Sequence, residues 1–325
     1  MASQRLLDEV AEVMRRLHYA ISAERSYCDW IKRYVRFHRL QSREELLAAG
    51  SREVELFLTS LAVEGRVAAA TQNQAMNALV FLYKRVLESP LEGEINAARV
   101  SKAPRVPVVL TREEVGALLP LLEGKAGLVT RLLYGSGLRI TEAVRLRVGD
   151  VDFGNRQITV RSGKGGSDRV TTFPLAIEAA LTAHLAKVRA LHQKDLADGF
   201  GEVYLPFALE KKYPNAAREW RWQYVFPSVS LARDPRSDEG KVRRHHLDQS
   251  AVNKAIRKAV GLAGIHKKVS AHTFRHSFAT HLLQRGTDIR TIQALLGHKD
   301  VETTMIYTHV LNQGAQGVPS PLDDL

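Results

Sequence analysis

The chain has 325 residues, of which 45% are hydrophobic and 25% are charged, so it is long enough for two domains with ordinary cores. Its 47 lysines and arginines outnumber 35 aspartates and glutamates, giving a formal net charge of +12. Such a basic protein favours a polyanionic partner, most often nucleic acid, although a solvated basic surface is the alternative. The single cysteine, Cys28, excludes an internal disulfide. Without a membrane-length apolar stretch or a secretory signal, a soluble cytoplasmic protein with no membrane partner is expected.

The first 95 residues or so have the spacing of amphipathic helices. A helix is predicted over 68–87, with a buried stripe made of Ala75, Leu79, Leu82 and Tyr83. Amides and cations lie between these apolar positions, at Gln72, Gln74, Asn77, Lys84 and Arg85. A basic, amide-rich helix can line a DNA major groove, but such residues are as often a wet helix face, and the sequence leaves both open.

A linker and a second domain follow. Residues 97–107 are basic, contain two prolines and have no periodicity, so they are predicted to form a linker. Thr111 and Glu114 then match a capping box, which predicts the first helix of the second domain. Residues 157–161 and 170–173 are rich in β-formers and predict a hairpin with a flexible tip.

Separated positions of the second domain carry side chains that suit phosphate chemistry. Arginines and a lysine can neutralise a pentacoordinate phosphorane, histidines can move protons, and a tyrosine can attack phosphorus. The positions are Arg139, Lys164, His272, Arg275, His298 and Tyr307. No carboxylate cluster with metal-ligand spacing accompanies them, so neither a metal nor another cofactor is expected.

The local setting of each residue supports this hypothesis only weakly by itself. Arg139 follows a glycine turn at a helix start, and Glu142 can orient its guanidinium or form an ordinary surface pair. Lys164 sits on the hairpin tip, where a solvated lysine is the ordinary interpretation and the Walker spacing is missing. Tyr307 taken alone would be a core or surface tyrosine.

One helical segment is more specific. His272, Arg275 and His276 fall within one arc of a helix, after the predicted cap Ser270. Zinc is a competing hypothesis for the two histidines, but their i, i+4 spacing comes with no third ligand.

A second capped helix follows it. Asp288 is predicted to cap this helix and Gly297 to end it, so that His298 projects from a sharp turn.

Together these motifs resemble those of the tyrosine recombinases. The resemblance covers the whole chain and implies a mainly α fold with a small β-sheet. It implies a helical, SAM-like core-binding DNA-binding domain over 1–95, a linker over 96–108 and a mixed α/β catalytic domain over 109–325.

Within that family the chain is most similar to the integron integrases. The basis is a long segment between the hairpin and the His272 helix, with an extra insert at about 192–222. Aromatic residues alternate with cations there, a composition that can stack unpaired bases, although some of these rings must pack the insert's own core. The resemblance implies that an extrahelical base is held by Trp222, Pro235, His245, His246, Lys211 and Lys212.

The resemblance also implies a reaction. Tyr307 would attack a phosphodiester to give a 3′-phosphotyrosyl link, while Arg139 and Arg275 stabilise the developing charge. Lys164 would protonate the leaving oxygen, His272 would assist on the tyrosine side, and His298 would hydrogen-bond the phosphate. Neither ATP nor a metal would be needed. A homotetramer on DNA in the bacterial cytoplasm would integrate and excise gene cassettes, using folded single-stranded hairpins and duplex sites.

Other functions remain open at this point. A generic phage or chromosomal tyrosine recombinase would share all six motif residues. A type IB topoisomerase would use a similar site for relaxation, which a two-site exchange assay separates from recombination. A non-catalytic DNA-binding regulator would share the basic charge, but would have no reason to keep the six residues together.

Overall fold

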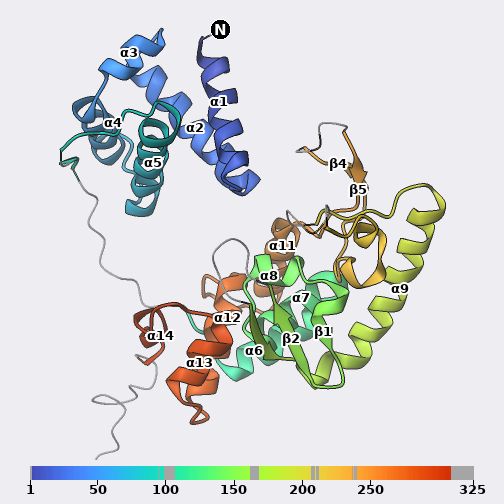
Figure 1. The fold of residues 1–325 in the computed structure, drawn as a ribbon. Helices are drawn as coiled ribbons and strands as arrows, with labels where there is room; N and C mark the ends of the chain where they lie inside the picture. The colour runs from blue at the N-terminus through green and yellow to red at the C-terminus, as the bar shows by residue number, and fades with distance from the viewer. Residues whose placement is uncertain are drawn as a thin grey trace, which may run out of the picture. The chain divides into compact units, whose positions relative to one another are not determined.

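The computed structural model describes residues 2–93, 95–98, 107–161, 168–205, 209, 212–235, 237 and 240–308. The chain forms two compact units, Met1–Arg105 and Val106–Leu325, called here the N-terminal and C-terminal units (Figure 1). The described structure is mostly helical, with two small antiparallel sheets, which confirms the predicted mainly α fold class. Among the described residues no helix is long and apolar enough to cross a membrane.

The N-terminal unit is entirely helical over its described residues. Its elements are α1 (Ala2–Arg16), α2 (Ile21–Phe37), α3 (Arg43–Ala48), α4 (Ser51–Val63), α5 (Ala69–Phe81) and a π-helix, Leu82–Val86. One hydrophobic core joins them, and helix α5 packs against α2 and α4. The predicted stripe of α5 and the π-helix is confirmed, since Ala75, Leu79 and Leu82 are fully buried and Tyr83 nearly so.

The prediction of a polar face on this helix is wrong at one residue. Gln72 is buried, and its amide Nε2 donates to the carbonyl of Leu58 at 2.9 Å and to that of Ala98 at 2.7 Å. It therefore satisfies backbone acceptors of its own unit. Asn77 and Lys84 are exposed, as predicted.

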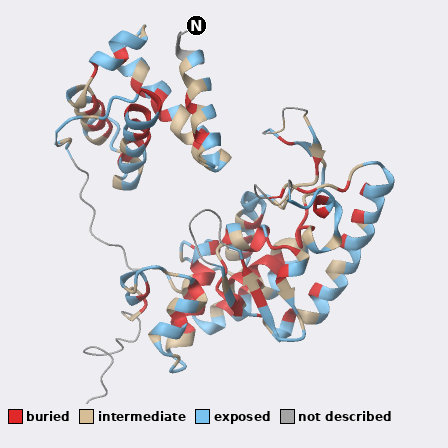
Figure 2. Ribbon diagram, in the orientation of Figure 1, coloured by how far each residue is buried: buried red, intermediate tan, exposed pale blue. Residues whose placement is uncertain are grey.

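The C-terminal unit packs helices against a three-stranded antiparallel sheet. Its helices are α6 (Arg112–Leu118), α7 (Gly124–Ser136), α8 (Ile140–Val144), α9 (Glu178–Ala197), α11 (Gln249–Leu262), α12 (Ala271–Leu283), α13 (Ile289–Leu296) and α14 (Glu302–Met305). Its strands are β1 (Val151–Asp152), β2 (Gln157–Val160), β3 (Arg169–Thr172), β4 (Ala232–Arg233) and β5 (Val242–Arg243). Helix α7 packs against α11 and α12, strand β3 contacts α7 and α13, and Figure 2 shows the buried residues gathered in the interior of this unit.

Local signals place the element ends correctly. The Thr111 hydroxyl accepts from the backbone N–H of Glu114 at 3.1 Å, and the Glu114 carboxylate accepts from Thr111 N at 2.7 Å, which confirms the capping box. Ser270 and Asp288 are the N-cap residues of α12 and α13. Strands β2 and β3 form the predicted antiparallel hairpin, with Val160 opposite Arg169.

The segment between α9 and α11 has a small core of its own. Val203, Leu205 and Tyr224 are buried in it, and Trp222 packs against it while half-buried. Two backbone hydrogen bonds, Val225 N to Leu146 O and Val148 N to Gln223 O, join the segment to the turn after α8. It is therefore fixed to the same body as α8 and the three-stranded sheet.

Candidate active site

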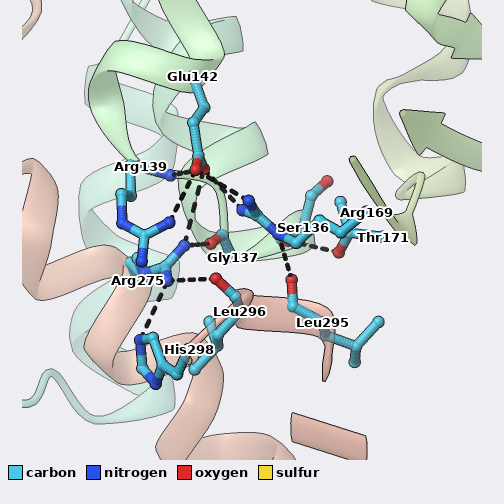
Figure 3. A network of polar contacts seen from close by, with 10 residues as sticks. All are labelled: Ser136, Gly137, Arg139, Glu142, Arg169, Thr171, Arg275, Leu295, Leu296 and His298. Carbon is cyan, nitrogen blue, oxygen red and sulfur yellow. Dashed lines mark hydrogen bonds and ion pairs between the residues drawn. The ribbon is translucent and has the colours of Figure 1, made fainter. Parts of the chain in front are cut away.

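A partly buried carboxylate at the start of α8 is the centre of a polar network (Figure 3). Glu142 accepts from Nη1 of Arg139 at 2.8 Å and from Nη1 and Nη2 of Arg169 at 2.9 and 2.7 Å. Burial alone would raise the pKa of this carboxyl, but the hydrogen bonds from Arg169 and Arg139 lower it to about 2. Glu142 is therefore ionised at neutral pH and orients two guanidinium groups.

Arg275 is buried on α12, with only 3% of its surface exposed. Its Nη1 donates to the carbonyl of Gly137, and its Nη2 donates to the carbonyl of Leu296 at 2.7 Å and lies 3.2 Å from Nε2 of His298. Burial and the charge of Arg139 lower the pKa of this guanidinium to about 10, so it still carries its proton at neutral pH. Of five N–H donors, two remain for a ligand.

The turn before Arg139 depends on glycine. Gly137 has φ +64°, and a Cβ there would lie 2.5 Å from the ring of Phe278. The left-handed residue ends α7 and presents its carbonyl to Arg275. This explains how the motif positions two arginines from different helices.

Arg169 is a site residue that the sequence interpretation missed. It begins β3 and is largely buried, and its Nε donates to the carbonyl of Leu295 at 2.9 Å. It joins Glu142 to the end of α13, where a Cβ on Gly297 would lie 2.7 Å from its Cδ. The sequence feature that could have indicated this residue is an arginine at the base of a predicted hairpin. A cation buried there needs a carboxylate partner.

His298 lies in the turn after α13, as predicted. Its Nε2 faces Arg275, which can only donate, and its Nδ1 lies 2.9 Å from Oγ1 of Thr304. The ring therefore carries its proton on Nδ1 and donates it to the threonine hydroxyl. Burial and the charge of Arg275 lower the pKa of this histidine to about 4, so the ring is neutral.

Tyr307 is buried against the same helices, with 2% of its surface exposed. Its ring packs in a cluster with Phe278 and Leu296 and stacks on His298, with ring centroids 6.3 Å apart. Its hydroxyl lies 3.0 Å from Nδ1 of His276. Burial raises the pKa of the phenol, and the charges of Arg275 and Arg139 oppose that rise.

His272 lies one turn before His276 on α12 and is exposed. The two rings meet edge to face, with centroids 5.8 Å apart. Partial desolvation and the charges of Arg275 and Arg139 lower the pKa of His272.

Lys164 lies outside the described residues. Val160 of β2 pairs with Arg169 of β3, and Arg169 contacts Glu142, so the last described pair of the hairpin lies beside the Glu142 network.

The site has the charge of an anion pocket. Arg139, Arg169 and Arg275 contribute three positive charges, and Glu142 contributes one negative charge, so the network carries a net +2. A pentacoordinate phosphorane has two negative charges on its non-bridging oxygens, which this excess can balance. Within the described part of the chain, no group of three histidine, cysteine or acidic side chains is placed to share a metal ion.

The residues predicted to hold a base lie along the segment between α9 and α11. Trp222 has the guanidinium of Arg161 5.4 Å and that of Arg221 5.3 Å from its ring centroid. His246 packs edge-on against the buried ring of Tyr224, and the adjacent His245 is half-buried.

The remaining residues of that set lie at the surface or outside the described chain. Pro235 is exposed next to β4, and Lys212 places its ammonium 5.3 Å from the ring centroid of Tyr213. Lys211 lies outside the described residues. The structure thus places Trp222 partly in the small core of the segment.

Acid is expected to destabilise the C-terminal unit through His276 and His298. Burial lowers the pKa of each ring from 6.5 to about 4. Between these values the unfolded chain binds protons that the folded chain does not, so the free energy of unfolding falls as the pH is lowered from 7 to 5. Chemical denaturation across this range measures the slope. The double variant His276→Asn, His298→Asn should have a shallower slope, and an unchanged slope would contradict the assignment.

Two family descriptions match this chain. Residues 109–313 match the Phage integrase family, and residues 6–93 match the Phage integrase N-terminal SAM-like domain. An integrase/recombinase of Escherichia coli is 47% identical over 327 residues, covering 100% of this chain and 95% of the relative. The tyrosine recombinase XerD of Agrobacterium fabrum is 31% identical over 290 residues, covering 84% of this chain and 80% of the relative.

Solved structures share the fold. The Tn1549 transposon integrase in complex with circular intermediate DNA is 16% identical, with a TM-score of 0.55 over 93% of this chain and 94% of that one. XerH recombinase bound to its difH substrate is 22% identical, with a TM-score of 0.51 over 80% of this chain and 67% of that one. The family match over residues 109–313 and the relatives at 47% and 31% identity show that the chain belongs to the phage integrase family, the tyrosine recombinases.

Proposed function

We propose that the chain is a site-specific DNA recombinase that cleaves and rejoins DNA through Tyr307. One observation carries the proposal: the phenol of Tyr307 lies against His298, whose Nε2 is 3.2 Å from Arg275 in a network with a net positive charge. A nucleophile beside an anion pocket is what phosphoryl transfer requires. The test is to incubate the wild-type protein with a nicked DNA site. A protein–DNA adduct that resists denaturation is the expected result.

The proposed steps give each motif residue one role. Tyr307 attacks phosphorus, the 3′-phosphotyrosyl bond forms, and the bond to the 5′ oxygen breaks. Arg139, which is more than one-third exposed, and the two remaining donors of Arg275 hold the non-bridging oxygens. Lys164 gives a proton to the 5′ oxygen, and His272, at the exposed face of α12, is the histidine that the resemblance implies as an acid/base group on the tyrosine side. His298 reaches the phosphate once its Nε2 carries a proton, which the Thr304 hydroxyl permits by donating to Nδ1.

DNA is the proposed partner, held by both units. The net charge of +12 supports a polyanion, and two solved structures with this fold, the XerH recombinase and the Tn1549 transposon integrase, hold DNA. The N-terminal unit presents Asn77, Lys84 and Arg85 from α5 and the π-helix as exposed polar side chains. Residues 1–95 are proposed as the core-binding domain, 96–108 as the linker and 109–325 as the catalytic domain. Exchange between two sites, each bound by two protomers, implies a homotetramer on DNA.

We further propose that the chain is an integron integrase that integrates and excises gene cassettes at folded single-stranded hairpins. The support is the segment between α9 and α11, which has its own core and displays cations and aromatic rings outside it. Pro235, His245 and His246 are its proposed base-contacting residues, and the outward part of the Trp222 ring is the proposed stacking surface. Lys211 and Lys212 are proposed backbone contacts.

Trp222→Ala is expected to weaken binding to a hairpin with flipped-out bases more than binding to the paired duplex. Stacking of a base on an aromatic ring contributes about 1–3 kcal/mol, or roughly 5- to 150-fold in affinity, and a paired duplex offers no such base. Equilibrium binding to the two substrates measures the ratio. Trp220→Ala is the matched control, since Trp220 lies in the same 3₁₀ turn but packs by His192. Equal losses on both substrates with a lower melting temperature would make Trp222 a core residue and leave only a generic tyrosine recombinase.

A further inference from the structure

We propose that His276 accepts the hydroxyl proton of Tyr307 when that tyrosine attacks DNA. The inference rests on the proposed function and assigns a further catalytic residue to it. His276 follows Arg275 on α12, and its Nδ1 lies 3.0 Å from the phenolic oxygen. Within the described part of the chain this is the one hydrogen bond of the Tyr307 hydroxyl. The reacting atom is therefore already held by a group that can take its proton.

The direction of this hydrogen bond follows from the partners present. Tyr307 is buried, so its O–H needs an acceptor, and Nδ1 of His276 is the acceptor among the described residues. A neutral imidazole has one lone-pair nitrogen, so Nδ1 accepts and Nε2 carries the ring proton. A tyrosine that donates to Nδ1 has its oxygen lone pairs free for phosphorus.

The charges around His276 favour the neutral ring before DNA binds. Arg275 precedes it and His272 lies one turn earlier on α12, and the rings of His276 and His298 both contact Tyr307. Burial, His272 and Arg275 lower its pKa to about 4, so the lone pair is available at neutral pH. A phosphate in the arginine cluster brings negative charge beside the ring, which favours the imidazolium as the phosphorane forms.

The step is balanced in atoms and charge. The Tyr307 O–H bond breaks and its proton moves to Nδ1 of His276, while the phenolic oxygen bonds phosphorus and the bond to the 5′ oxygen breaks. That oxygen takes its proton from the leaving-group acid, proposed to be Lys164. In rejoining, the 5′-hydroxyl attacks, phenolate leaves, and the imidazolium returns its proton.

His272 occupies a different place. It is exposed, and its ring centroid lies 5.8 Å from that of His276, whereas the His276 and Tyr307 ring centroids are 5.5 Å apart and are joined by a hydrogen bond. The Tyr307 hydroxyl has no hydrogen bond to His272 among the described residues. We therefore separate the two histidines of α12, with His276 on the nucleophile and His272 on the phosphate.

Single-turnover cleavage of a nicked site by the full-length protein tests the proposal. His276→Ala and His276→Asn are both expected to cleave about 100-fold more slowly with unchanged DNA affinity, the scale of losing a general base. Asparagine can accept a hydrogen bond near the Nδ1 position but cannot take a proton, so it separates proton transfer from positioning. Recovery to the wild-type rate in His276→Asn would overturn the proposal.

The same helix offers a matched control. Nδ1 of His281 lies 2.8 Å from the hydroxyl of Tyr134, a second histidine–tyrosine pair outside the arginine network. His281→Asn is expected to cleave at the wild-type rate. If His276→Asn proves unfolded by its melting profile, His276→Gln, which also lacks a protonatable nitrogen, takes its place.

A substrate with a sulfur atom in the 5′-bridging position shows whether a residue donates a proton to the leaving group or takes one from the tyrosine. A thiolate leaves without protonation, so Lys164→Ala should recover on this substrate while the His276 variants stay slow. Recovery of His276 variants would place the residue on the leaving-group side and overturn the inference. If the wild type forms the adduct and the His276 variants cleave at the wild-type rate, this inference alone is refuted. If Tyr307→Phe forms an adduct, the proposed function itself is refuted.

Discussion

Tyr307→Phe is expected to bind DNA normally and to form no covalent adduct. The substitution deletes the nucleophilic oxygen and one hydrogen bond, the 3.0 Å contact with His276, while the ring keeps its packing against Phe278 and Leu296. Loss of one such hydrogen bond costs about 1 kcal/mol of stability, which leaves the unit folded. Denaturing gel electrophoresis after incubation with a nicked site measures the adduct, and a mobility shift measures DNA binding.

Tyr134→Phe provides the control for this variant. Tyr134 is half-buried in the same unit and its hydroxyl also contacts a histidine, His281, so the same atom is removed from a similar pair. It should form the adduct as the wild type does. An adduct that persists in Tyr307→Phe would show that another residue attacks DNA.

Arg275→Lys is expected to slow cleavage by at least about 100-fold, the scale of losing one preorganised donor in the transition state. Lysine keeps the positive charge but has no planar fork and only three N–H donors, so contacts to Gly137 and Leu296 would leave it one donor for a phosphate. DNA affinity should change far less, since the charge at position 275 is kept and the chain has a net charge of +12. Single-turnover cleavage and equilibrium binding measure the two effects.

Arg161→Lys is the matched control for that substitution. Arg161 pairs with Asp150 at 2.6 Å and lies outside the Glu142 network. Its lysine variant should cleave near the wild-type rate on duplex sites. A normal rate in Arg275→Lys would exclude Arg275 from the chemistry, and a large drop in its melting temperature would show that its two carbonyl contacts serve the fold instead.

The sequence by itself determined the local structure of this protein. The capping box at Thr111, the caps at Ser270 and Asp288, and the left-handed end of α13 at Gly297 were all predictable. Each depends on neighbours within about four residues, so the one-dimensional pattern contains the information. The hairpin was predictable for the same reason, because alternation and a glycine-rich tip specify β2 and β3.

Four of the motif residues, Arg139, Arg275, His298 and Tyr307, lie together among the described residues. Arg139 and Arg275 share the carboxylate of Glu142, and His298 contacts both Arg275 and the ring of Tyr307. Glycine turns made this possible, because Gly137 and Gly297 bring backbone carbonyls and the His298 ring close to the arginines. Periodicity also predicted which apolar faces would be buried. It placed Gln72 on a solvent-exposed face, whereas the fold buries this residue.

Only the tertiary structure decided the partners of the buried polar groups. Arg169 meets Glu142 across 27 positions and the carbonyl of Leu295 across 126, and His276 meets Tyr307 across 31. A helical arc places His272 and His276 on one face but cannot say which ring faces the tyrosine. That choice depends on how α12 packs beside α13, because a buried hydroxyl or guanidinium takes whichever partner the packed chain leaves within hydrogen-bond distance.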